Sequence, residues 1–151
     1  MSASVQLTSL PAWSAMLDYC SPGDFIDCYS VECDLSVREA AEIIVQFPSW
    51  VQLLMLLREV VTTPFGLKNS LDEGEVSIGI FPIESESDRE ILAGFDDKHL
   101  NFRISIAAED GKVFLATWVR PHNMGGKLYL SVIMPFHILI CRNALGRIAN
   151  R

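Results

Sequence analysis

The amino-acid sequence predicts an α+β domain in which a long C-terminal helix lies across one face of an antiparallel sheet. Apolar residues recur at helical spacing over residues 36–61, alternate with polar residues over 76–120, and return to helical spacing over 128–148. Segregation of helices and strands along the chain is typical of this fold class. With 151 residues, half of them hydrophobic, the chain is long enough to form a single domain, residues 1–151, with its own core.

One strand and two helices are expected in the first part of the chain. Residues 1–20 carry scattered apolar groups and are expected to be a loosely ordered N-terminal segment, whereas residues 24–33 hold β-formers bounded by turn residues. Ser36 and Glu39 fit a capping box at the start of a short helix over 36–47, which Pro48 ends. The apolar spacing that follows predicts a second, largely buried helix over residues 50–61.

A four-stranded meander and a final helix are expected in the second part. The four strands are predicted over residues 76–80, 91–95, 100–106 and 113–120. We expect an acidic turn over residues 84–88 and a hairpin turn at Glu109-Asp110-Gly111. The chain should close with a long helix that Pro135 kinks, because proline removes a main-chain hydrogen bond. The predicted order is therefore β-α-α-β-β-β-β-α.

Charge and targeting signals exclude several function classes. The chain has 12 Lys and Arg against 19 Asp and Glu, a formal net charge of −7, which argues against nucleic acid as a partner. Residues 1–20 contain no Lys or Arg, so that no signal peptide is predicted. The apolar clusters at 53–57 and 132–141 are shorter than a membrane span. We therefore expect a soluble, cytoplasmic protein that does not bind a membrane.

Motifs for cofactors and metals are missing from the sequence. The three histidines show neither HExxH nor i, i+4 spacing, and Gly125-Gly126 lacks the spacing of phosphate-binding loops. The four cysteines show no CxxC spacing and are interpreted as reduced, buried thiols. We expect no cofactor and no metal.

Several short motifs resemble an uncharacterised bacterial domain family of unknown function. They are Gly94-Phe95-Asp96-Asp97-Lys98-His99-Leu100-Asn101-Phe102-Arg103, His122-Asn123-x-x-Gly126-x-x-Tyr129, Pro135-Phe136-His137, Pro48-Ser49-Trp50-Val51, Leu57-Arg58 and Gly66-Leu67-Lys68. The resemblance covers residues 24–147 and implies a START-like, or helix-grip, fold whose sheet curls around the last helix. Similar domains are found alone or fused behind dinucleotide-binding oxidoreductase-like domains, and membership implies no established activity. Lys127 stands where the family more often has arginine, which keeps the charge but removes a bidentate donor.

Polar residues on the third meander strand and just before it are the first candidates for a site. Period-two alternation places His99, Asn101, Arg103 and Ser105 on the sheet face away from the core helix. This stripe is a solvated outer face, a polar ligand site or a dimer surface. Two interpretations of Asp97 are open. It is expected to stabilise a turn by bonding its own backbone, and the alternative is that it orients the imidazole of His99 for general acid–base catalysis.

The junction between the last strand and the long helix supplies the other candidates. Asn123 is expected to cap the helix, and the alternative is that His122, Asn123 and Tyr129 contact a ligand at the mouth of a cavity. We expect His137 to bond the backbone freed by Pro135. The candidate ligand-binding residues are Arg103, His122, Tyr129, His99, Asp97 and Asn123.

A mean hydropathy of +0.26 indicates that some apolar surface lines a cavity or an interface. Three functions remain open. The first is a binding domain for a small apolar or amphipathic ligand between the sheet and the final helix. The second is an interaction domain whose other sheet face meets a second copy or an oxidoreductase-like partner. The third is a cyclase- or dehydratase-like enzyme, which requires the His, Asp, Arg and Tyr candidates to converge on one pocket.

Overall fold

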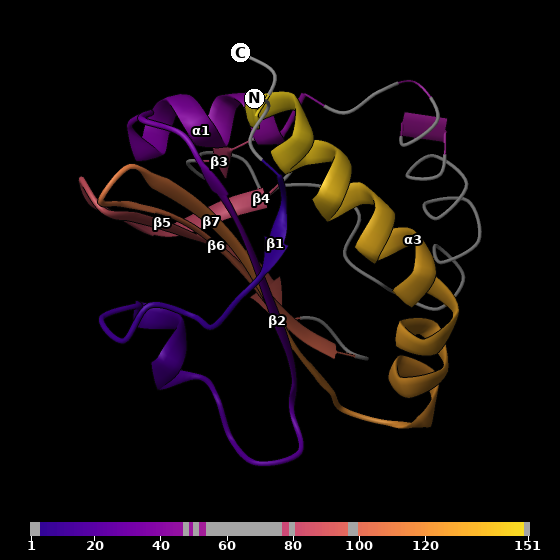
Figure 1. Cartoon of the computed structure of the whole chain (residues 1–151). Helices are drawn as coiled ribbons and strands as arrows, with labels where there is room; N and C mark the ends of the chain where they lie inside the picture. The colour runs from indigo at the N-terminus through magenta and orange to yellow at the C-terminus, as the bar shows by residue number, and fades with distance from the viewer. Residues whose placement is uncertain are drawn as a thin grey trace.

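The computed structural model describes residues 4–46, 49, 52–53, 77–78, 81–96 and 100–149. Within them a seven-stranded antiparallel sheet has the long helix α3 along one face, while the N-terminal segment crosses the other face (Figure 1). The predicted α+β class, with an antiparallel sheet and a long C-terminal helix, is therefore confirmed.

The strands are β1 (Gln6–Leu7), β2 (Phe25–Glu32), β3 (Ser77–Ile78), β4 (Phe81–Glu86), β5 (Glu90–Asp96), β6 (Leu100–Glu109) and β7 (Lys112–Pro121). The helices are α1 (Val37–Ile44), α3 (Met124–Ala149) and a turn of 3-10 helix, η1 (Ala15–Asp18). Their order across the sheet is β1-β2-β7-β6-β5-β4-β3. The meander therefore places its last strand, β7, against the early strand β2.

Alternation along the strands produces two different sheet faces. On the first face, inward side chains of β2, β5, β6 and β7 form the main core with α1 and the end of α3. The buried members from α3 are Cys141, Ala144, Leu145 and Ile148. The second face carries a smaller cluster in which the N-terminal segment contributes Met16 and the sheet contributes Trp118.

Local signals read from the sequence are present where expected. Ser36 caps α1, its hydroxyl accepting from the Glu39 amide while the Glu39 carboxylate accepts from the Ser36 amide. Asp110 and Gly111 both have positive φ angles in the two-residue turn between β6 and β7, which suits a type I′ hairpin. Pro135 lies inside α3, and the first turns of this helix run in a different direction from the rest (Figure 1).

The acidic turn expected over residues 84–88 is wrong in its position. Glu84 lies within β4, which pairs with β5, and the bend occurs at Asp88 and Arg89. Pro82 and the acidic residues resemble a turn in sequence, but a proline and solvent-facing carboxylates are tolerated in a strand near the sheet edge.

Three other expectations concern the second helix, residues 1–20 and the cysteines. Of the helix predicted over 50–61, Gln52 and Leu53 are described and helical, and the rest lies outside the described residues. Neither β1 nor η1 was expected within residues 1–20, yet β1 pairs with β2 and Met16 of η1 is fully buried. The cysteines are free, with Cys28 and Cys141 buried, and burial raises the pKa of the Cys28 thiol to about 12.

Candidate functional site

Arg103 lies on the second sheet face, as the alternation of β6 predicts. Phe102 and Ile104 point toward the main core, while Asn101, Arg103 and Ser105 point the other way. This face is not the solvated surface that we considered, because residues of the N-terminal segment cover it. The Arg103 side chain is 11% exposed and Ser105 is 1% exposed.

The guanidinium of Arg103 is held by groups of its own chain. It donates from Nη1 to Asn101 Oδ1 at 2.7 Å and to the Phe102 carbonyl at 2.8 Å, and its Nε lies 3.6 Å from Glu84 Oε1. The Tyr19 ring stacks against it at 5.0 Å, and the Tyr19 hydroxyl donates to Glu84. Arg103 therefore ties β6 to β4 and to the N-terminal segment.

Burial, followed by the hydrogen bond to Glu84, raises the pKa of Tyr19. Its phenol consequently stays protonated at neutral pH and acts as a donor to the carboxylate. The structure assigns Tyr19 and Glu84 to this network, and the sequence offered no local signal for either residue.

Asp24 organises a neighbouring polar group beside Arg103. Arg120 donates to both of its carboxylate oxygens, at 3.0 and 2.7 Å, and the Trp118 indole donates to Oδ2 at 3.0 Å. The hydrogen bonds from Arg120 hold the pKa of Asp24 well below its usual range. Arg120 also donates to the Tyr19 carbonyl at 3.0 Å, so that this pair anchors the N-terminal segment to β7.

A buried carboxylate fastens the same segment at the other end of the face. Glu90 is 6% exposed and accepts from the Ser14 hydroxyl, from the Ala15 amide at 2.8 Å and from the Ser105 hydroxyl at 2.5 Å. A buried carboxyl group is tolerated only when its oxygens have such hydrogen-bond partners. Arg103, Asp24 and Glu90 thus have partners within the chain, and the N-terminal segment covers this described part of the second face.

The other candidates within the described residues have partners other than Arg103. His122 bonds Asp96 through Nε2 at 2.5 Å in an exposed position, and Asn123 caps α3 by accepting from the Gly126 amide at 2.9 Å, as expected. Tyr129 is half-buried on α3, which lies along the first face. Asp97 and His99 lie outside the described residues.

The first half of α3 presents a half-buried inner face toward the sheet. Its inward positions continue the helical spacing of the buried residues Cys141 and Ile148, but unlike them they stay partly exposed. These half-buried residues are Tyr129, Leu130, Ile133, Met134, His137 and Ile138. The helix is therefore packed closely on the sheet over its last turns and less closely over its first ones.

The first sheet face carries aromatic rings that are half-buried, like the inner face of α3. Phe25, Val119, Phe102 and Phe95 follow one another across four strands in register. The ring of Phe102 lies 5.5 Å from that of Phe95 and 5.6 Å from that of Phe81 on β4. Together with the inner face of α3, these rings form what we call the aromatic surface, made by Phe25, Phe81, Phe95, Phe102, Tyr129, Ile133 and Met134.

His137 joins α3 to β2 beside this surface, rather than bonding the backbone near Pro135 as expected. Its Nε2 lies 3.0 Å from Asp27 Oδ2, and its ring meets Phe25 edge-on. Burial alone lowers the pKa of His137, but the hydrogen bonds with Asp27 and Cys141 outweigh burial and raise it to about 10. Asp27 Oδ1 is buried and, within the described residues, has no hydrogen-bond partner.

Cys141, His137 and Asp27 do not form a nucleophilic triad. The Cys141 sulfur lies 3.7 Å from one ring nitrogen of His137 and 3.8 Å from the other. Nearly equal distances place the sulfur over the ring instead of in line with one N–H, so that proton transfer is not aligned. The thiol is also buried. We interpret it as a packing group of the core.

The ion pair of His137 and Asp27 should make stability depend on pH. Because the folded-state pKa of about 10 lies above the ordinary value of 6.5, the stabilisation is complete below about pH 6.5 and is lost as the pH rises through 10. We expect His137→Gln to cost roughly 2 kcal/mol at pH 6 and much less at pH 10. Urea unfolding of both proteins across this range measures the difference, and a difference that is constant with pH would contradict the charged pair.

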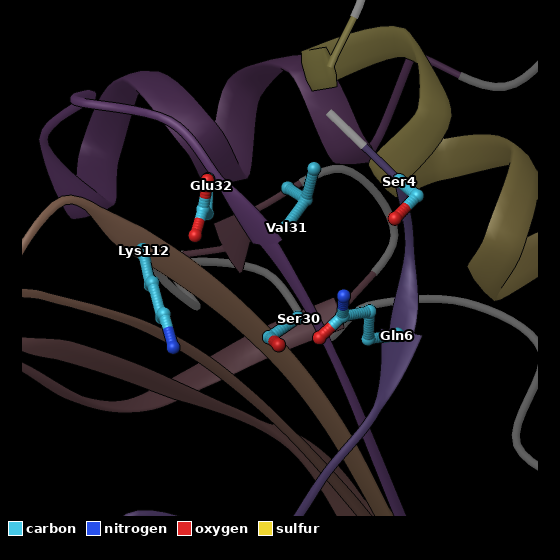
Figure 2. A pocket seen from close by; sticks show the side chains of 6 residues that line it. All are labelled: Ser4, Gln6, Ser30, Val31, Glu32 and Lys112. Carbon is cyan, nitrogen blue, oxygen red and sulfur yellow. The ribbon is translucent and has the colours of Figure 1, made fainter. Parts of the chain in front are cut away.

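A small pocket lies at the sheet edge, far from the aromatic surface. Figure 2 shows its lining, with Gln6 of β1 beside Ser30 of β2, and its volume is about 90 Å³. The lining residues are Ser4, Gln6, Ser30, Val31, Glu32 and Lys112. Pockets for small organic molecules are typically about 300–1,000 Å³ and mostly apolar, so we do not assign a function to this one. Within the described part of the chain, no three His, Cys, Asp or Glu side chains gather to hold a metal ion.

Comparison with known families matches residues 21–144 to a family described as a protein of unknown function (DUF2867). The matched range begins before β2 and ends in α3, so that it includes the aromatic surface and leaves out η1. Comparison with curated proteins and with solved structures found no match.

Proposed function

The chain belongs to this DUF2867 family, and we propose that it is a binding domain for a small apolar or amphipathic molecule. The single observation that carries the proposal is the aromatic surface. Its residues lie on the inner face of α3 and on the first face of the sheet, and they are half-buried, whereas the strand and helix positions of the main core are buried.

The arrangement of helix and sheet supports a START-like, helix-grip fold as part of the proposal. Such a fold has a long C-terminal helix across an antiparallel sheet and binds ligands between the two. Here the first turns of α3 and the row of rings on β2, β6 and β5 would supply the two sides of such a site. Likeness of fold does not identify the ligand, which is argued from the side chains alone.

The chemistry of the surface defines the ligand class. Phe95 and Phe102 offer ring faces and edges, and Ile133 and Met134 offer adaptable aliphatic contacts. Asp27 adds one buried acceptor oxygen, so that a ligand with an apolar body and a hydroxyl or amine donor suits the surface. Arg103 is not part of this site, because it points to the second face.

Two measurements test the proposal. The first compares the native mass of protein purified from its own host with its denatured mass, and we expect an excess mass from a bound small molecule. The second titrates the protein with the fluorescent probe 1-anilinonaphthalene-8-sulfonate, for which we expect a saturable site with one probe per chain.

A matched pair of variants locates the probe. Phe95 and Phe114 are both half-buried, but Phe95 belongs to the aromatic surface and Phe114 packs on the second face. We expect Phe95→Leu to weaken probe binding about tenfold, which is about 1.4 kcal/mol, and Phe114→Leu to leave it unchanged. An unmodified native mass together with equal affinities for both variants would remove the proposal.

The other two functions have less support. The sheet face that we considered for a second copy is covered by Met16, Tyr19 and other residues of the same chain. For an enzyme, Arg103 and Tyr129 would need to meet at one pocket, but they lie on different sides of the sheet. An interaction between copies has a better candidate surface on α3.

A further inference from the structure

The outer side of α3 carries a continuous row of exposed apolar side chains, which we call the outer stripe. Its members and exposed fractions are Met124 (74%), Leu128 (68%), Val132 (64%), Phe136 (44%) and Leu139 (57%). Steps of four, four, four and three residues keep them on one side of the helix, opposite the inner face. At 1.5 Å per residue the stripe is about 22 Å long.

This stripe lies at the upper end of the apolar patches found on monomers, and patches of this size are often functional. Five large apolar side chains at these exposures present on the order of 500 Å², which is as large as the largest apolar patch on a typical monomer. Only 17% of the most apolar part of α3 is buried, whereas the core helix of a soluble domain is mostly buried. The stripe therefore indicates an interface that a single copy leaves open.

We propose that the outer stripe joins two copies of this chain through antiparallel packing of their α3 helices. A twofold axis beside Val132 places Met124 against the partner's Leu139, and Leu128 against the partner's Phe136. The symmetry repeats each of these contacts with the two copies exchanged. Val132 is the smallest member of the stripe and lies at the crossing point, where it lets the two backbones approach closely.

Area and electrostatics agree with this occupant. Covering both stripes buries about 1,000 Å² before their flanks are counted, which is about the minimum size of a biological interface. The stripe contains no charged residue, so that no unpaired charge is buried at its centre.

A lipid bilayer is a less suitable occupant, although α3 is long and apolar enough to cross one by length and composition. A spanning α3 would have to withdraw Cys141, Leu145 and Ile148 from the main core, where each is 5% exposed or less. Surface binding to anionic lipid would act against the formal net charge of −7.

Sedimentation equilibrium of the full chain between 1 and 100 µM tests the proposal. We expect a dimer of twice 16.9 kDa, and we expect Val132→Glu to raise the dissociation constant at least a hundredfold by placing two carboxylates at the twofold axis. Lys127→Glu adds the same side chain to an exposed position of α3 outside the stripe and should leave the dimer intact.

Cross-linking gives a second test that does not depend on the folding of Val132→Glu. With oxidised glutathione, Val132→Cys should form a disulfide with the partner's copy, because residues at a twofold axis lie within bonding reach, while Lys127→Cys should not. A monomer across the whole range, or a dimer that survives Val132→Glu, would overturn the proposal. So would a monomer that sediments with phosphatidylglycerol vesicles and loses this binding in Val132→Glu.

Discussion

Replacing Gly94 with alanine is expected to destabilise the domain by at least about 3 kcal/mol, enough to unfold much of the protein. Gly94 has a φ of +140°, a backbone conformation that other residues rarely adopt. A Cβ atom there would lie 2.2 Å from the Phe102 carbonyl oxygen and 2.8 Å from the Arg103 Cα. Both atoms belong to the backbone of β6, which is fixed by its ladder with β5 and cannot move aside cheaply.

Gly146 supplies the control for this prediction. It lies within α3, and a Cβ atom built on it meets nothing within 4 Å. Gly146→Ala should therefore stabilise the protein by about 0.5–1 kcal/mol, because alanine favours the helix. Urea unfolding of both variants measures the difference, and a loss below about 1 kcal/mol in Gly94→Ala would show that β5 and β6 are not packed as described.

Local patterns predicted the parts of the fold that depend on neighbouring residues. The alternation from Leu100 to Ile106 identified which side chains of β6 face the core, and Ser36 and Glu39 identified the start of α1. Each of these signals lies within a few residues, where spacing and propensity decide the conformation. The resemblance to an uncharacterised family is likewise confirmed by the match over residues 21–144.

Contacts between distant residues could not be predicted in the same way. The N-terminal segment covers the second sheet face because Glu90 accepts hydrogen bonds from Ser14 and Ala15, which precede it by 76 and 75 residues. Residues 1–20 show no periodic pattern, so they were expected to be loosely ordered. Asp27 and His137 are 110 residues apart, and their pairing depends on the path of α3 across the sheet.

For the site, the sequence identified polar residue types but not the face on which they act. Arg103 was a reasonable ligand contact while its sheet face was open to either solvent or a partner. Tyr19 and Glu84 change that assignment, because both contact the guanidinium of Arg103 although they are distant from it in the sequence. The aromatic surface was missed, since half-buried rings such as Phe95 look like ordinary core residues in a sequence.

Truncating Trp118 is expected to have the second large effect, a loss of about 3–5 kcal/mol in Trp118→Ala. The side chain is fully buried in the cluster with Met16, and its ring lies 5.2 Å from that of Tyr19. Alanine would leave a cavity beneath the N-terminal segment and remove the indole N–H that donates a hydrogen bond to Asp24. The segment would then lose much of the apolar contact that holds it on the sheet.

Two further variants separate the causes of that loss. Trp118→Phe keeps an aromatic ring and removes the donor, so it should cost about 1–3 kcal/mol, less than Trp118→Ala. Trp13 also lies in the N-terminal segment, but it is half-buried, bonds Glu109 at 2.8 Å and stacks on Arg89, so Trp13→Ala should cost only about 1 kcal/mol. Urea unfolding ranks the three variants. If Trp13→Ala were as costly as Trp118→Ala, the segment would be held mainly at its hydrogen-bonded edge, and the buried tryptophan would not be the anchor of the second face.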